Sequence, residues 1–87
     1  MYKIEWKQSA TKELKNLKKS DIPRIIEAVE KLSVNPSPPG TRKLQGCEQL
    51  YRIRVGEYRV VYSIKNKVLL IEIIRVGHRK NIYKNII

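Results

Sequence analysis

Three arginines lie close together in one short stretch of the sequence, YRIRVGEYRVVYSI, which runs from Tyr51 to Ile64. They are Arg52, Arg54 and Arg59. A guanidinium group presents its N–H donors in a rigid plane and stays positively charged at any physiological pH, so it suits bidentate contacts with phosphate oxygens. The chemistry that this stretch indicates is therefore the binding of a phosphate and the stabilisation of further negative charge on it.

A second group of polar side chains follows the last apolar segment of the chain. The sequence RVGHRKNIY supplies Arg75, His78, Arg79 and Tyr83 in that order. Histidine exchanges protons near neutral pH, and a tyrosine does so when nearby cations favour its phenolate form. The group is therefore a candidate for proton transfer, and the competing interpretations are a packing role for Tyr83 and a solvated loop position for His78.

Alternation of apolar and polar residues predicts a β-hairpin that positions the first group. Gly56 and Glu57 form a two-residue turn with glycine first, as a type II′ hairpin requires. The resulting register places Arg54 opposite Arg59 and sends all three arginines to one face of the sheet. The other face then carries the apolar side chains of the hairpin, which are Tyr51, Ile53, Val55, Tyr58, Val60 and Tyr62.

Opposed arginines need a source of negative charge. Like charges that face each other across two strands cost a few tenths of a kcal/mol to about 1 kcal/mol. A bound phosphate removes this cost and is the favoured interpretation. Two alternatives remain open: Glu57 or Glu72 forms a surface ion-pair network with the arginines, or water alone screens them.

The whole sequence, residues 1–87, predicts a single α+β domain with the element order β-α-α-β-β-β. We expect the helical hairpin to pack on one face of a mainly antiparallel four-stranded sheet and to leave the other face open. Ser20 or Asp21 is expected to cap the second helix, and the long apolar last strand is expected to be buried on both faces at a central or inner position of the sheet. The predicted strands are 2–6, 50–55, 58–64 and 68–76, the helices are 9–19 and 21–33, and a proline-rich connector covers 35–40.

The charge of the chain predicts a polyanionic or acidic partner. Lysine and arginine total 19 against 8 aspartates and glutamates, which gives a formal net charge of +11. Residues 42–87 hold eleven of the basic side chains and three of the acidic ones, so the positive field belongs mainly to the second half of the chain.

Several classes of protein are excluded by composition. A single cysteine, Cys47, cannot form an intramolecular disulfide, and together with one histidine it is too little for a Cys/His metal site. We therefore expect no metal or other cofactor and a reducing, cytoplasmic location. The longest uninterrupted apolar run, 68–71, is far shorter than the roughly 20 residues of a membrane-spanning helix.

Three motifs in this order resemble the RelE toxins of bacterial and archaeal toxin–antitoxin systems, within the RelE/ParE superfamily. They are KLQG at Lys43–Gly46, the arginine hairpin and VGHRKNIY, and the resemblance covers almost the whole chain. It implies a messenger-RNA endonuclease, or mRNA interferase, that acts in the ribosomal A site, inhibits translation and is held inactive by a cognate antitoxin.

The resemblance also implies roles for individual residues. Arg52 and Arg54 match basic positions that contact the scissile phosphate, and Arg59 matches an arginine that stabilises the phosphate. Arg79 and Tyr83 match a catalytic pair near the C-terminus. Some relatives have lysine in place of the first two arginines and a longer spacing before the tyrosine. The remaining cations expected to bind RNA are Lys43 and Arg75.

This set of residues supports a cleavage in which the RNA supplies its own nucleophile, the 2′-OH. Tyr83 is the candidate general base. The proton donor is left open between Arg79, which keeps its proton too tightly to be a good acid, and His78, which titrates near neutrality.

Two other functions remain open. A ParE-like toxin that inhibits gyrase shares the fold, although the combination of Arg59, Arg79 and Tyr83 argues against it. A non-catalytic module that binds RNA or the ribosome needs only the positive charge, but it leaves the placement of Tyr83 unexplained.

Overall fold

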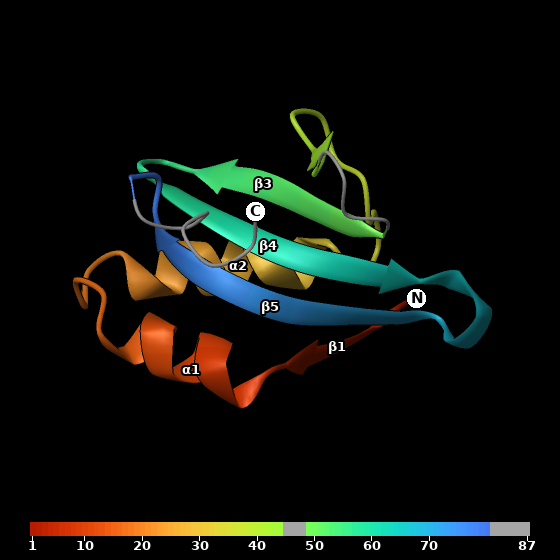
Figure 1. The fold of residues 1–87 in the computed structure, drawn as a ribbon, viewed down its shortest axis with the longest axis horizontal. Helices are drawn as coiled ribbons and strands as arrows, with labels where there is room; N and C mark the ends of the chain where they lie inside the picture. The colour runs from red at the N-terminus through yellow and green to blue at the C-terminus, as the bar shows by residue number, and fades with distance from the viewer. Residues whose placement is uncertain (45–48, 81–87) are drawn as a thin grey trace.

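A twisted five-stranded sheet with two helices forms the computed structural model of the chain, which describes residues 1–44 and 49–80 (Figure 1). The helices are α1 (Gln8–Lys15) and α2 (Ile22–Lys31). The strands are β1 (Lys3–Trp6), β2 (Arg42–Lys43), β3 (Leu50–Val55), β4 (Tyr58–Lys65) and β5 (Leu70–His78), with a short 3-10 turn, η1 (Asn66–Val68), between the last two.

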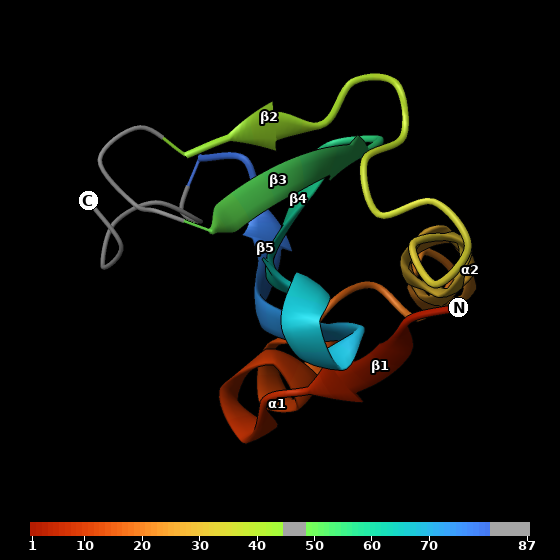
Figure 2. The ribbon, with the colours of Figure 1, turned by 90° about the vertical axis from the view of Figure 1, so that its right-hand side faces the viewer.

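The strands lie in the order β1-β5-β4-β3-β2, with β1 and β2 at opposite edges (Figure 2). Only the β1–β5 pair is parallel, so the predicted α+β fold and mainly antiparallel sheet are confirmed. The expected count of four strands is wrong, because Arg42–Lys43 pairs with β3 as an additional strand. A two-residue strand is too short to show a period-2 pattern in the sequence.

The predicted hairpin register is confirmed pair by pair. Arg54 lies opposite Arg59, Arg52 lies opposite Val61, and the two-residue turn begins at Gly56. Gly56 has a φ of +59°, which the first central residue of a type II′ turn requires and which a side chain would disfavour. Because the side-chain period of a strand is two, this register alone decides which face carries the arginines.

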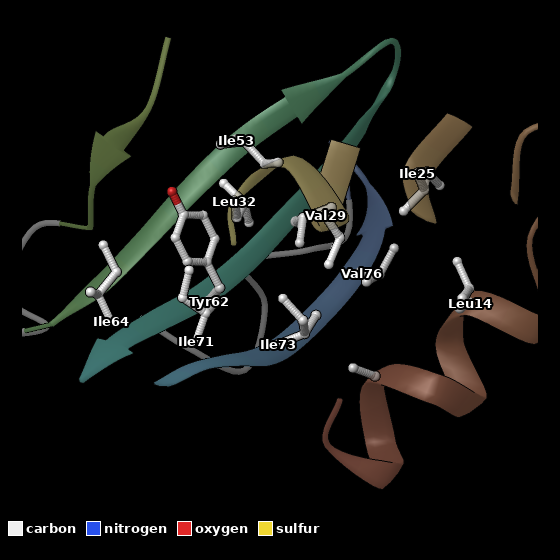
Figure 3. Packing of buried hydrophobic residues seen from close by; sticks show 12 residues of the cluster. Leu14, Ile25, Val29, Leu32, Ile53, Tyr62, Ile64, Ile71, Ile73 and Val76 are labelled. Atoms are coloured by element: carbon white, nitrogen blue, oxygen red, sulfur yellow. The ribbon is translucent and has the colours of Figure 1, made fainter. Parts of the chain in front are cut away.

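One apolar core joins both helices to one face of the sheet (Figure 3). Tyr62 is a fully buried member of this core, and its hydroxyl donates a hydrogen bond of 2.7 Å to the carbonyl oxygen of Pro36. Each large side chain that is fully buried in this way stabilises the fold by about 1.5–3 kcal/mol. The buried members of the core are Ala10, Leu14, Ile25, Val29, Leu32, Ile53, Val60, Tyr62, Ile64, Ile71, Ile73 and Val76.

Helix α2 starts differently from the prediction. Asp21 occupies the position before the helix, but its side chain makes no capping hydrogen bond with the first turn. One carboxylate oxygen, Oδ2, instead accepts a hydrogen bond of 2.8 Å from the Tyr58 hydroxyl. The carboxylate thus ties the helix to the hairpin rather than to its own backbone.

The second face of the sheet is less open than the sequence suggested. Leu44 and Val61 are buried there, against the partly buried Leu50 and Ile74. Strand β5 is an inner strand as expected, but its burial alternates along the strand, and the strand that is central and buried on both faces is β4. Among residues 1–44 and 49–80, no helix has the length and hydropathy that crossing a membrane requires.

Candidate phosphate-binding site

Arg54 and Arg59 form a cross-strand pair on the face of the sheet opposite the helices. Arg54 is exposed, whereas Arg59 is only 8% exposed. The Arg59 guanidinium donates one hydrogen bond from Nη1 to the carbonyl oxygen of Tyr58, at 3.1 Å, and no carboxylate of the described residues forms an ion pair with it. A buried cation is costly without a counter-charge, so the position favours the binding of an anion.

A second cross-strand pair of arginines extends this cationic face. Strand β2 places Arg42 directly opposite Arg52, two residues along β3 from Arg54. Side chains that oppose each other across strands share a face, so Arg42 joins the predicted arginines. The sequence did not predict a role for Arg42 because it did not predict β2. The only indication of such a role was the excess of basic over acidic residues in the second half of the chain.

Lys43 does not share this face. It pairs with Tyr51, whose side chain packs against the core beneath the helices. Neighbouring residues of a strand point to opposite faces, so the register separates Lys43 from Arg42. The predicted RNA-binding role of Lys43 remains a prediction, and it is not supported by proximity to the arginine pairs.

Arg75 is held by a carboxylate of helix α1. Its Nε and Nη2 donate hydrogen bonds of 3.2 and 2.8 Å to Glu13 Oε2. The other oxygen, Oε1, accepts a hydrogen bond of 3.1 Å from the backbone N–H of Val76. Strand β1 ends opposite Ile73. Beyond this point Glu13 takes the place of β1 as the hydrogen-bond acceptor for the backbone of β5. Arg75 therefore differs from Arg59 in having a carboxylate partner.

The two glutamates that were expected as neutralising groups contact other side chains. Glu57 Oε2 lies 3.2 Å from Nε2 of His78, and Glu72 Oε1 lies 3.7 Å from Nζ of Lys65. Neither contact involves Arg54 or Arg59. The described residues thus form no ion-pair network around Arg54 and Arg59.

The second predicted group begins beside the hairpin turn. His78, the last residue of β5, pairs with Tyr58, and the two rings meet edge to face at 6.2 Å. Arg79 follows, with an exposed side chain and a backbone N–H that donates to the Glu57 carbonyl oxygen at 3.0 Å. The structure therefore brings His78 and Arg79 to the end of the hairpin that carries Arg54 and Arg59. Tyr83 lies outside the described residues.

Two tyrosines of β4 are unsuited to act as bases. The hydrogen bond that the Tyr58 hydroxyl donates to Asp21 raises the pKa of Tyr58, and burial raises the pKa of Tyr62. Both effects favour the protonated phenol. These hydroxyls therefore serve as hydrogen-bond donors within the fold, and the general base must be sought elsewhere.

Comparisons with known proteins agree over nearly the full chain. Residues 4–83 match the family model described as ParE toxin of type II toxin–antitoxin system, parDE. The chain is 32% identical over 85 residues to Toxin RelE3 of Methanocaldococcus jannaschii, covering 93% of this chain and 94% of that protein.

Solved structures give the same result. The chain is similar to the archaeal RelE–RelB complex from Pyrococcus horikoshii OT3, with a TM-score of 0.80, 32% identity and coverage of 92% of this chain and 97% of that one. It is also similar to the toxin–antitoxin complex RelBE2 from Mycobacterium tuberculosis, with a TM-score of 0.78, 26% identity and coverage of 90% and 98%.

Proposed function

The chain belongs to the RelE/ParE family and is a RelE-like toxin of a type II toxin–antitoxin system, and from this premise we propose that it is a metal-independent endoribonuclease that cleaves messenger RNA in the ribosomal A site. The observation that carries the proposal is the pair of opposed arginines, one of which is buried without a carboxylate partner among the described residues. The phosphate of an RNA chain is an anion of the right kind to occupy this pair.

The reaction needs a displacement at phosphorus. The 2′-oxygen of the ribose attacks the adjacent phosphorus, the new bond to that oxygen forms, and the bond to the 5′-oxygen of the next nucleotide breaks. Arg54 and Arg59 bind the non-bridging oxygens and stabilise the charge that accumulates on them, with Arg52 beside them. The products carry a 2′,3′-cyclic phosphate and a 5′-hydroxyl.

Two proton transfers accompany this displacement. In the proposal, Tyr83 removes the proton of the 2′-OH, and the neighbouring guanidinium groups favour its phenolate form. Arg79 stabilises the departing 5′-oxygen and can donate the second proton. The alternative donor, His78, already uses both ring nitrogens in contacts with Glu57 and with the backbone of Lys80, which favours Arg79.

A cognate antitoxin is the proposed regulatory partner. The solved relatives named above are complexes of a toxin with its antitoxin. An acidic segment of such a protein can occupy the arginine pairs in place of RNA, because carboxylate and phosphate accept the same guanidinium donors. The positive charge of this chain gives both ligands a long-range attraction, and their common site makes their binding mutually exclusive.

A gyrase-inhibiting activity of the ParE branch is the second candidate, because the matching family model is described as a ParE toxin. The two candidates differ in the nucleic acid that is damaged. Expression in growing cells, followed by mapping of RNA 5′ ends and measurement of DNA breaks, separates them. Cuts in translated messages that keep a fixed phase to the codons support the proposal. DNA breaks without such cuts support gyrase inhibition, and growth arrest without either supports a non-catalytic module.

A further inference from the structure

We propose that Glu57 is a positioning residue that fixes Arg79 relative to the Arg54–Arg59 pair. The contacts of Glu57 with His78 and Arg79 are here called the clasp, and His78 serves in this clasp rather than in proton transfer. The inference rests on the proposed endoribonuclease function and adds to it a residue with no place in the RNA chemistry itself. Glu57 lies in the hairpin turn, whereas Arg79 follows the last strand, so contact between them joins the two halves of the candidate site.

Glu57 makes two separate contacts with the segment that carries Arg79. Its backbone oxygen accepts the N–H of Arg79 at 3.0 Å. Its carboxylate lies 3.2 Å from Nε2 of His78. One residue of the turn therefore fixes two consecutive residues at the point where the chain leaves β5, immediately after Gly77, which lies opposite Arg59.

The imidazole of His78 continues the clasp by one more residue. Its Nδ1 accepts the backbone N–H of Lys80 at 3.3 Å, so the other ring nitrogen is left to donate to Glu57. The neutral ring with its proton on Nε2 satisfies both contacts at once. A general acid needs a ring nitrogen that faces the leaving oxygen, and both nitrogens are here used to fix the direction of the chain through Arg79.

The other side of the turn is also held in place. The Tyr58 hydroxyl donates to Asp21 at the start of α2, and Arg24 of the same helix lies 3.8 Å from the Asp21 carboxylate. The guanidinium of Arg24 packs over the turn, since a Cβ at Gly56 would lie 3.3 Å from its Nη2. The turn is thus fixed against the helix layer, which gives Glu57 a rigid base from which to orient Arg79.

A contact between exposed side chains, such as that of Glu57 with His78, adds little to stability, so a positioning role and a structural role predict different results for Glu57→Ala. We expect kcat for cleavage on ribosomes programmed with a defined message to fall about 10-fold to 100-fold, with KM and Tm almost unchanged. Glu57→Gln keeps an oxygen that accepts from His78 and is expected to retain most of the activity. The matched control is Glu5→Ala, which removes one negative charge and an exposed ion pair with Lys3 on edge strand β1.

A double mutant separates the clasp from acid catalysis. If Glu57 and His78 act as one unit, His78→Ala in the Glu57→Ala background causes little further loss of kcat. A loss that multiplies in the double mutant overturns the assignment of His78 to the clasp. Amide hydrogen exchange checks the geometry directly: the N–H of Lys80 should exchange faster in Glu57→Ala, because its acceptor His78 loses the Glu57 carboxylate, while the N–H groups of the β3–β4 ladder should not change.

The possible failures are distinguishable. If the wild-type protein and Glu5→Ala do not cleave messenger RNA, the proposed function fails and this inference fails with it. If both cleave and Glu57→Ala cleaves with the wild-type kcat, the positioning role alone is wrong. A fall in Tm large enough to account for the lost activity also overturns it, since the effect would then be one of stability.

Discussion

Residue chemistry at the candidate site depends on burial as much as on residue type. Arg54 and Arg59 carry the same guanidinium group, but only Arg59 is buried. Within the described part of the chain, its guanidinium forms one hydrogen bond, to a backbone carbonyl oxygen. A desolvated guanidinium acts on a phosphate more strongly than a hydrated one because the local dielectric is low. We therefore assign to Arg59 the largest share of the charge stabilisation.

Replacing Arg59 by alanine should lower the rate of RNA cleavage about 100-fold to 1,000-fold, the size of effect seen when a donor to a developing anion is lost. Single-turnover cleavage on programmed ribosomes measures this rate. Lys12→Ala is the control, because this exposed cation lies on helix α1, which packs against the opposite face of the sheet. Retention of full activity by Arg59→Ala would contradict the mechanism.

The base assignment has its own test. Tyr83→Phe removes only the hydroxyl, so it should abolish proton removal from the 2′-OH while leaving RNA affinity near that of the wild type. The rate of a single turnover and the dissociation constant for RNA are measured separately. Loss of affinity with an unchanged rate would show that the hydroxyl binds RNA instead of acting as a base.

Individual elements decide which cations act together. Strand β2 is only two residues long, yet its pairing with β3 places Arg42 opposite Arg52 and directs Lys43 to the opposite face. Helix α1 similarly gives Arg75 a partner in Glu13. The same residue types therefore have different roles according to the strand or helix that lies beside them.

Arg42→Ala should weaken RNA binding and make the slope of log K against log salt shallower by about one, as expected for the loss of one phosphate contact. Lys43→Ala is a closely matched control, since it removes the same charge from the neighbouring position of the same strand. Equal effects of the two variants would mean that net charge, and not the arginine face, governs binding.

The contact between β4 and the start of α2 predicts a dependence of stability on pH. The pKa of Tyr58 is raised in the folded chain by its hydrogen bond to Asp21, and that of Tyr62 by burial. The folded state thus binds these protons more tightly than the unfolded state, so the free energy of unfolding falls as pH rises through and above about 10. Urea titrations between pH 8 and 11 measure the fall, and Tyr58→Phe should make it smaller.

At the scale of the whole molecule, the large apolar core and the proposed functional face lie on opposite sides of one sheet. The larger cluster of buried side chains joins both helices to strands β3, β4 and β5, and the arginine pairs lie on the other face of the same sheet, beside the smaller cluster of Leu44 and Val61. Separation of this kind allows a strongly basic surface to exist without charges in the core. It also means that substitutions in the core should act through folding and not through chemistry.

Ile25→Ala should lower the free energy of unfolding by about 2–5 kcal/mol, because it leaves a cavity where α2 packs on the sheet. Denaturation with urea measures the change, and Val34→Ala, at a position 75% exposed, should have little effect. At a temperature where both variants are fully folded, the single-turnover cleavage rate should match the wild type. A reduced rate in the folded Ile25→Ala protein would show that the core shapes the site.

The sequence by itself determined the hairpin register, because a glycine-first turn and a strict period of two allow only one arrangement that keeps arginines out of the core. It also determined the order of the helices and of every strand except β2, the amphipathic character of both helices and the family resemblance. These features depend on residues near each other in the chain, where spacing alone carries the information.

Only the tertiary structure decided how distant segments share the site. The pairing of β2 with β3, the contact of Glu13 with Arg75 and the clasp of Glu57 on His78 and Arg79 each join residues that local spacing cannot relate. The direction of a basic side chain and the groups that it contacts are decided only when the strands pair and the helices pack on them. Burial of Arg59 and neutralisation of Arg75 are therefore consequences of packing, and they distinguish arginines that are alike in the sequence.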